Sequence, residues 1–323
     1  MQQMKLRNNQ DSSISQVKVA TSARLHMGFF DLSGAISKFG SLGISLNAPC
    51  THITLARSDK VLIDAKSDEN VTKIVKILVN TFNVKQNFSL IMHDCIPAHA
   101  GLGSGTQLAL AIGAGLNQLF NLDISLAQIA LVSKRGKRSG IGIGAFAQGG
   151  VLVDTGITND ELPKIAIRQN FPENWRVLLV NDSASKGVHG DAELQAFKLL
   201  KPAQNSLRDM MFNYMMPALH RSDLLAFGVY MMDLQAYNGA YFAPVQGGHF
   251  ASCDVAEVLA WLQTSGAPCV GQSSWGPTGF AILRSAEHAE SLKNQAQLTF
   301  ASKPNISFTV CCGKNTGATI STS

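Results

Sequence analysis

The segment Pro97-Ala98-His99-Ala100-Gly101-Leu102-Gly103-Ser104-Gly105-Thr106 decides the fold of this chain. It follows residues 88–95, which predict a strand that ends before the proline. Its glycines permit backbone angles that turn N–H groups inward, and a helix N-terminus adds partial positive charge, so the segment suits phosphate binding. It is neither a Walker P-loop nor a dinucleotide-binding loop with a leading βαβ unit. Taken alone, it is also consistent with a tight turn from strand to helix.

Residues 104–120 predict the helix behind this loop. Apolar side chains recur there at steps of three and four residues, at Leu108, Ile112, Leu116 and Leu119. This is the period of a helix with one buried stripe. Small residues between them allow a neighbouring element to approach closely.

The remaining pattern mixes strands and helices without a regular βαβ alternation, which predicts an α+β protein. Further strands are predicted at residues 17–20, 53–55, 151–154, 176–180, 280–283 and 308–310. A capping box at Ser125 and Gln128 opens one helix, and residues 256–263 form another. The polar stretch 159–174 contains two prolines and predicts a linker. We therefore expect an N-terminal domain over residues 1–158, with a polar leader at 1–15, and a C-terminal domain over residues 159–323.

Composition narrows the class of protein. The 323 residues are 46% hydrophobic and 15% charged, which excludes intrinsic disorder. No apolar run approaches the ~20 residues of a membrane span, and the leader lacks the apolar region of a secretion signal, so we expect a cytoplasmic protein. A net charge of +5 is too diffuse to indicate a nucleic-acid partner. The six cysteines lack zinc-ligand spacing and predict buried thiols, with a vicinal redox pair at Cys311 and Cys312 as the alternative.

The loop and its helix closely resemble the phosphate loop of the GHMP kinase superfamily. Further on, Ser139-Gly140-Ile141-Gly142 and then Gly149-Gly150 stand where those kinases carry Ser-Gly-x-Asp followed by Gly-Gly. Many of these kinases use that Asp as the base on the substrate hydroxyl, and Gly142 cannot accept a proton. The resemblance therefore implies a two-domain GHMP fold with its active site in the cleft between the domains, and it puts the kinase mechanism in doubt.

Three other runs resemble the signatures of the β-ribofuranosylaminobenzene 5′-phosphate synthase family, a non-kinase branch of the superfamily. They are Arg-Leu-His-Met-Gly-Phe-Phe-Asp-Leu at 24–32, Arg-Gly-Lys-Arg-Ser-Gly-Ile-Gly at 135–142 and Gly-Gln-Ser-Ser-Trp-Gly-Pro-Thr at 271–278. The resemblance implies decarboxylating transfer of a phosphoribosyl group from phosphoribosyl pyrophosphate to 4-aminobenzoate or 4-hydroxybenzoate, in tetrahydromethanopterin biosynthesis. It also implies Mg²⁺ and a homodimer. The alternatives are an ATP-dependent small-molecule kinase and a non-catalytic ligand sensor on the same fold.

The run Lys134-Arg135-Gly136-Lys137-Arg138 places four cations in five residues. A polyanion relieves their mutual repulsion, so we expect phosphate binding, although a solvated helix end is the ordinary explanation of such a cluster. A nucleic-acid surface would need a longer stripe with interleaved aromatic residues. The predicted phosphate-binding residues are Gly101, Gly103, Ser104, Gly105, Thr106, Arg135, Lys137 and Arg138.

Arg24 and His26 lie two residues apart, hence on one face of an extended segment, where they would hold a benzoate carboxylate or a ribose 5-phosphate. Together with Asp31 they are the predicted catalytic residues. The alternative for His26 is a half-buried, hydrogen-bonded imidazole, and the alternative for Asp31 is a turn cap. Asp31 and Ser104 are the candidate Mg²⁺ ligands.

The last predicted group binds the substrate. Ser273, Ser274 and Trp275 lie in a third glycine-containing loop, which by resemblance lies beside the first. The Trp275 ring would stack on an aromatic substrate. Packing in the core is the alternative.

Overall fold

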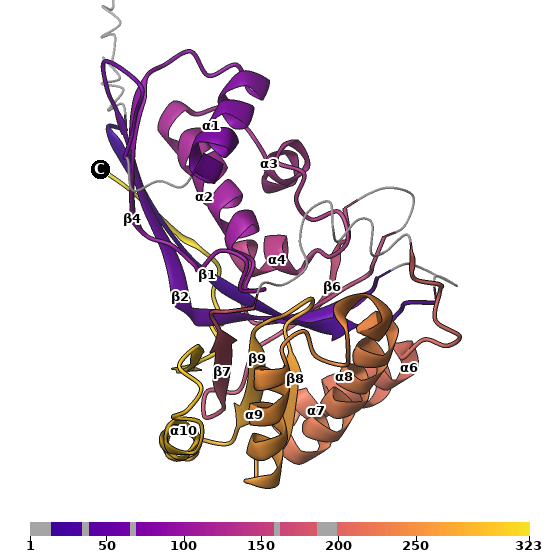
Figure 1. Cartoon of the computed structure of the whole chain (residues 1–323). Helices are drawn as coiled ribbons and strands as arrows, with labels where there is room; N and C mark the ends of the chain where they lie inside the picture. The colour runs from indigo at the N-terminus through magenta and orange to yellow at the C-terminus, as the bar shows by residue number, and fades with distance from the viewer. Residues whose placement is uncertain (1–13, 34–38, 65–68, 158–161, 186–198) are drawn as a thin grey trace, which may run out of the picture.

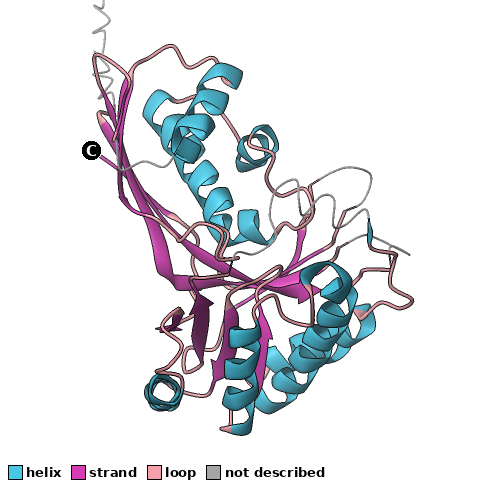
Figure 2. Ribbon diagram, in the orientation of Figure 1, coloured by secondary structure: helices cyan, strands magenta, loops and turns pink. Residues whose placement is uncertain are grey.

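The computed structural model describes residues 14–33, 39–64, 69–157, 162–185 and 199–323 (Figure 1). Nearly all of the predicted polar leader lies outside these residues. The chain forms two β-sheets, each covered by helices (Figure 2). No helix in the described part of the chain is both long and apolar enough to cross a membrane.

The first sheet is built on a long antiparallel pair, β1 (Gln16–Phe29) and β2 (Ser41–Arg57). Its order is β11-β1-β2-β4-β3, where β11 is Thr319–Thr322, β4 is Phe88–Asp94 and β3 is Leu62–Ile63. The beginning of β2 also pairs with β5 (Val151–Asp154), which pairs in turn with β6 (Ile165–Gln169).

Four helices cover one face of this sheet: α1 (Glu69–Thr81), α2 (Ser104–Phe120), α3 (Leu126–Val132) and α4 (Ile141–Ala147) (Figure 1). The predicted helix over 104–120 is confirmed. Gly115 brings α2 against the sheet, because a Cβ there would lie 2.4 Å from a methyl group of Leu55. The capping box is confirmed as well, since Ser125 Oγ accepts a hydrogen bond from the N–H of Gln128.

The second sheet has the order β10-β7-β9-β8 and is antiparallel. Its strands are β7 (Arg176–Asp182), β8 (Cys269–Gln272), β9 (Gly279–Leu283) and β10 (Ile306–Cys311). Along β7 and β9, alternate apolar side chains face opposite sides, as a period of two requires. One side packs against α9 (Cys253–Thr264) and α10 (Ala286–Thr299). The other packs against η1 (Met211–Met215), a π-helical turn that follows α6 (Arg208–Met210), and against α7 (Met216–His220) and α8 (Leu224–Gln246).

The core beneath α7 and α8 also contains Leu25, Met27, Leu42 and Ile44 of the first sheet, so it joins the two halves of the molecule. The α+β class is confirmed. The predicted boundary at residue 158 lies outside the described residues. Two strands from beyond it, β6 and β11, belong to the first sheet, so the division between the sheets does not follow that boundary.

The cysteines differ from the expectation of buried thiols. All six are free, and Cys269 and Cys311 are buried. Cys95 and Cys253 are exposed, which makes the expectation wrong for these two. Cys311 is the last residue of β10, and the adjacent Cys312 is only half-buried.

Candidate active site

The glycine-rich loop reaches α2 through three residues in the left-handed region, with φ of 60° at His99, 76° at Gly101 and 82° at Gly103. Gly103 is the N-cap of α2 and caps the helix without a side chain. A residue with a side chain rarely adopts such a φ, so Gly101 and Gly103 are needed to shape the turn. The loop thus presents the N-terminal end of a 17-residue helix, which favours an anion.

The carbonyl of Gly101 is the atom at which three segments of the candidate site meet. It accepts hydrogen bonds from Arg24 Nη1 at 2.6 Å and from Ser273 Oγ at 2.8 Å. Beside it, Thr278 Oγ1 donates to the carbonyl of Ala100 at 2.6 Å. The structure therefore brings together β1, the glycine-rich loop and the loop 273–278, which are far apart in the sequence.

Arg135 is the member of the basic run that reaches this loop. Its guanidinium lies against the first turn of α2, because a Cβ on Gly105 would be 2.9 Å from Arg135 Nη2. Burial lowers the pKa of this guanidinium, and its Nε has no hydrogen-bond partner among the described residues. Lys137 is exposed and Arg138 is half-buried.

Arg24 and His26 alternate on β1 with Leu25 and Met27, which face the core between the sheets. The ring of His26 is fully buried, 4.6 Å from the ring of Phe29, and neither ring nitrogen has a hydrogen-bond partner among the described residues. Burial, and then the charge of Arg24, lower the pKa of His26 to about 3. The expected alternative of a half-buried, hydrogen-bonded imidazole is therefore wrong, and His26 is neutral at pH 7.

The loop 273–278 is held to the backbone of His26 on β1 by two hydrogen bonds. The N–H of His26 donates to Ser273 Oγ at 3.2 Å, and the N–H of Ser274 donates to the carbonyl of His26 at 3.0 Å. Ser273 is buried and Ser274 is half-buried. Trp275 packs in the interior against the ring of Phe242, with the centroids 4.3 Å apart, as the core alternative predicted.

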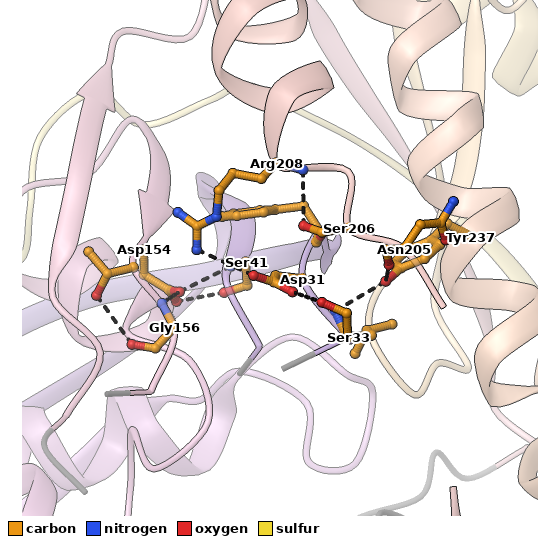
Figure 3. A network of polar contacts seen from close by, with 12 residues as sticks. Asp31, Ser33, Ser41, Asp154, Gly156, Asn205, Ser206, Arg208 and Tyr237 are labelled. Carbon is orange, nitrogen blue, oxygen red and sulfur yellow. Dashed lines mark hydrogen bonds and ion pairs between the residues drawn. The ribbon is translucent and has the colours of Figure 1, made fainter. Parts of the chain in front are cut away.

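Asp31 follows β1 by two residues, and its side chain contacts Ser33 and Arg208 (Figure 3). Its buried carboxylate accepts a hydrogen bond from Ser33 Oγ at 2.7 Å and forms an ion pair with Arg208 Nη2 at 3.4 Å. The contact with Ser33 joins two side chains and is not the bond to a backbone N–H that a turn cap makes. Within the described residues, no three His, Cys, Asp or Glu side chains gather where they would hold a metal ion.

Asp154, at the end of β5, has a role that was not predicted (Figure 3). Its fully buried carboxylate accepts hydrogen bonds from the N–H and Oγ of Ser41, from Ser139 Oγ, and from the N–H groups of Gly140 and Gly156, at 2.6–3.0 Å. Burial raises the pKa of Asp154, and these hydrogen bonds oppose that shift. Asp154 therefore fixes the Ser139–Gly140 turn between the basic run and α4. The only sequence signal is an acidic residue that ends an apolar strand before Thr155-Gly156.

Comparisons with known proteins agree with this geometry. Residues 69–150 match the GHMP kinases N terminal domain, and residues 215–302 match the GHMP kinases C terminal domain. The beta-ribofuranosylphenol 5′-phosphate synthase of Methanocaldococcus jannaschii is 31% identical over 299 residues, which cover 82% of this chain and 88% of that protein. The enzyme of the same name from Methanothermobacter thermautotrophicus is 27% identical over 297 residues, which cover 83% of this chain and 89% of that protein. The chain belongs to the beta-ribofuranosylphenol 5′-phosphate synthase family.

Solved structures show the same fold at low identity. Homoserine kinase from Cytophaga hutchinsonii superposes with a TM-score of 0.67 at 17% identity, covering 99% of this chain and 100% of that one. Mevalonate diphosphate decarboxylase from Staphylococcus aureus superposes with a TM-score of 0.65 at 16% identity, covering 95% of this chain and 98% of that one. The predicted GHMP fold is confirmed.

In this synthase-family chain, Gly142 lies where the resemblance places the kinase base. A Cβ on Gly142 would be 2.9 Å from Thr106 Cγ2, in the first turn of α2, and the carbonyl of Gly142 accepts a hydrogen bond from Gln107 Nε2 at 2.8 Å. The position faces the phosphate loop, but it carries no carboxylate. Gly142 instead packs α4 closely on α2.

Proposed function

We propose that this chain transfers a phosphoribosyl group from phosphoribosyl pyrophosphate to 4-hydroxybenzoate or 4-aminobenzoate, with loss of pyrophosphate and CO₂. The observation that carries the proposal is the pair of hydrogen bonds to the carbonyl of Gly101, by which Arg24 and Ser273 of the loop 273–278 lie beside the N-terminal end of α2. Family membership supports the reaction class. The relatives are named as synthases of a ribofuranosylphenol, which favours 4-hydroxybenzoate as the acceptor.

The chemistry requires no external base. The ring carbon that bears the carboxylate forms a bond to C1 of the ribose, while the C1–O bond breaks and its electron pair leaves with pyrophosphate. The bond to the carboxylate then breaks, CO₂ departs, and that electron pair restores the aromatic ring. The para hydroxyl or amino group donates electron density during the attack, and no net proton transfer is needed. The absence of a carboxylate at Gly142 is compatible with this chemistry.

The protein's contribution is then mainly electrostatic. The loop 101–106 and Arg135 would neutralise the departing pyrophosphate. Of Arg24 and His26, Arg24 carries the positive charge, so Arg24 would hold the benzoate carboxylate. His26, which is fully buried and neutral at pH 7, would add no charge to the binding of the acceptor.

We propose that Mg²⁺ enters with the pyrophosphate of the substrate. Mg²⁺ in phosphate sites keeps several waters and takes only one or two carboxylates from the protein. This fits a chain whose described residues hold no three-ligand cluster. Asp31 and Ser104 remain the candidates, and Asp31 would have to give up part of its contact with Ser33 or Arg208. The cytoplasmic location remains a prediction.

The test uses 4-hydroxybenzoate and 4-aminobenzoate labelled at the carboxyl carbon, with phosphoribosyl pyrophosphate and Mg²⁺. We expect labelled CO₂ to appear in step with pyrophosphate. Label retained in a ribosylated product would show O- or N-ribosylation and reject the proposed reaction. A parallel assay with ATP and homoserine or mevalonate should yield no sustained ADP, and turnover at about 1 s⁻¹ or faster would favour the kinase alternative.

Replacing Arg135 by methionine should raise the KM for phosphoribosyl pyrophosphate about tenfold or more. The reason is the loss of a charge-assisted contact, typically worth about 1.5–3 kcal/mol, at the end of α2. Lys137→Ala removes a cation at an exposed position of the same run and is the matched control, with a KM close to that of the parent. Equal KM values for both variants and the parent would place Arg135 outside the phosphate site.

A further inference from the structure

Segments of the candidate site are attached along one edge of β1. The other edge of β1 pairs with β2, whereas β11 covers this edge only from Val17 to Ala20. Further along it, the N–H of Arg24 donates to the carbonyl of Leu102 at 3.1 Å. The loop 273–278 then bonds to the backbone of His26. Backbone groups on a strand edge need partners, and here the glycine-rich loop and the loop 273–278 supply them.

A β-bulge extends this edge past His26. The register of β1 with β2 shifts between His26 and Gly28, and Met27 has no partner on β2. An extra residue of this kind changes which backbone groups face each edge of a strand. The carbonyl of Met27 and both backbone groups of Phe29 are thereby turned to the open edge, where α8 lies.

Two side chains of α8, one helical turn apart, bond to this stretch. Gln235 Nε2 donates to the carbonyl of Met27 at 2.5 Å, and Gln235 Oε1 accepts from the N–H of Gln272 at 2.8 Å. Asn238 Oδ1 accepts from the N–H of Phe29 at 2.8 Å, and Asn238 Nδ2 donates to the carbonyl of Phe29 at 2.9 Å. Gln235 therefore joins β1 to β8, whereas Asn238 joins α8 to β1.

The sequence leaves room for Gln235 at Gly271. A Cβ on Gly271 would lie 2.4 Å from Gln235 Cδ, so a side chain there would displace the carboxamide. The next residue, Gln272, is the last of β8, and its own Nε2 donates to the carbonyl of Ser274 at 2.9 Å. Gln235 thus holds the backbone of β8 at the point where the loop 273–278 begins.

The partners of Gln235 require one donor and one acceptor. Met27 offers a carbonyl and Gln272 offers an N–H, so a carboxamide satisfies both, in one orientation. A carboxylate of the same length keeps the bond to Gln272 but sets a second acceptor against the carbonyl of Met27. A protonated carboxyl group again has a donor and an acceptor.

We propose that Gln235 is a positioning residue, which fixes the loop 273–278 relative to the part of β1 that carries Arg24 and His26. The proposal rests on the proposed function, because the decarboxylating transfer is the reaction that depends on this placement. Gln235 acts through the loop and not on the substrate.

The connection from Gln235 to the substrate runs through Ser273. Ser273 Oγ donates to the carbonyl of Gly101, to which Arg24 Nη1 also donates. A displacement of β8 at Gln272 moves Ser273, the next residue, and with it this carbonyl. The guanidinium of Arg24 then loses the contact that orients it. Binding of the benzoate carboxylate, which we assign to Arg24, is weakened as a result.

Kinetics of Gln235→Glu and Gln235→Met test the effect on the reaction. At pH 7 each variant should raise the KM for 4-hydroxybenzoate at least about tenfold, because a buried backbone group loses its partner. The KM for phosphoribosyl pyrophosphate should stay close to that of the parent, since its proposed site is built on α2 and the basic run. Burial raises the pKa of a carboxyl group, so at pH 5 Gln235→Glu gains a proton. Its KM should then return toward that of the parent at the same pH, whereas Gln235→Met should not recover.

Asn238→Asp is the matched control. It makes the same change of carboxamide to carboxylate one helical turn away, against the carbonyl of Phe29, and leaves the bond between Gln235 and β8 in place. Circular dichroism should show that the variants fold, and Gln235→Met carries the test if Gln235→Glu does not. Both carboxylate variants should lower the free energy of unfolding, but only Gln235→Glu should raise the KM for 4-hydroxybenzoate.

Hydrogen exchange at pH 7 tests the placement of the loop without an assay of activity. The amides of residues 272–276 should exchange at least about tenfold faster in both Gln235 variants than in the parent, and at the parent's rate in Asn238→Asp. Unchanged exchange in the Gln235 variants, or equal acceleration in all three variants, would overturn the proposal. Faster exchange with an unchanged KM for 4-hydroxybenzoate would also overturn it. A parent chain without decarboxylating transfer would reject the proposed function, and the exchange rates would still decide whether Gln235 holds the loop.

Discussion

Replacing Gly101 by alanine is expected to lower kcat/KM by at least about a hundredfold, a loss of about 2.7 kcal/mol in transition-state stabilisation. Gly101 has a φ of 76°, and a Cβ there would lie 2.8 Å from the carbonyl oxygen of Gly276 and 3.1 Å from that of Ser273. Both neighbours are backbone atoms, which cannot rotate away as a side chain would. The methyl group therefore has to separate the glycine-rich loop from the loop 273–278.

Two other glycines separate this effect from backbone strain. Gly247 has a φ of 85° and no atom within 4 Å of its Cβ position, so Gly247→Ala measures the strain alone, about 1–2 kcal/mol of stability. Gly103 has a similar φ, but its Cβ would meet the side chain of Arg24 at 3.0 Å, which can move. We expect the loss of kcat/KM in Gly103→Ala to lie between the losses in Gly247→Ala and Gly101→Ala. A folded Gly101→Ala enzyme with kcat/KM within threefold of the parent would remove this loop from the site.

The sequence predicted best what depends on neighbouring residues. Helix α2, the capping box of α3 and the turn at Gly101 and Gly103 are each encoded by residues within a few positions of one another. Helical period and glycine content report such local structure directly. The association of these segments with the loop 273–278 came from family resemblance, because no pattern within one segment identifies a partner more than 150 residues away.

The contacts that the sequence did not predict are long-range. Ser41 and Asp154 are 113 residues apart, and Asp31 and Arg208 are 177 residues apart. Each side chain alone is an ordinary polar residue. Only the pairing of β2 with β5 and the approach of α6 to the end of β1 bring them together. Strand β11 was missed for a similar reason, because Thr-Ile-Ser-Thr is exposed on both faces and is ordered by pairing with β1.

The basic run shows how a correct composition signal can mislead about geometry. Its four cations suggested one phosphate-binding cluster. The structure turns Arg135 toward Gly105 and leaves Lys137 in solvent, with the left-handed Gly136 between them. A count of charges does not say which of these cations lies near the end of α2, because that depends on the course of the backbone.

Lowering the pH from 7 to 5 is expected to destabilise the protein by about 2 kcal/mol through His26 alone. Its pKa is about 3 in the folded chain, against an ordinary value of 6.5. Below pH 6.5 the unfolded chain binds a proton at this residue, while the folded chain does not until about pH 3. The free energy of unfolding therefore decreases by about 1.4 kcal/mol for each unit that the pH is lowered below 6.5, down to about pH 3. Above pH 6.5 His26 is neutral in both the folded and the unfolded chain, so its titration costs no stability there.

Urea unfolding of the parent and of His26→Leu at pH 7 and pH 5 measures this effect, with His220→Gln as a control for removing an exposed histidine. The parent and the control should lose about 2 kcal/mol more between the two pH values than His26→Leu does. The comparison within each variant cancels the packing change that leucine introduces, because that change is the same at both pH values. If all three lose equally, the pKa of His26 is not lowered in the folded chain, and His26 carries a proton there at pH 5. At pH 5 its imidazolium would then stand beside Arg24, and the assignment of positive charge to Arg24 alone would fail at that pH.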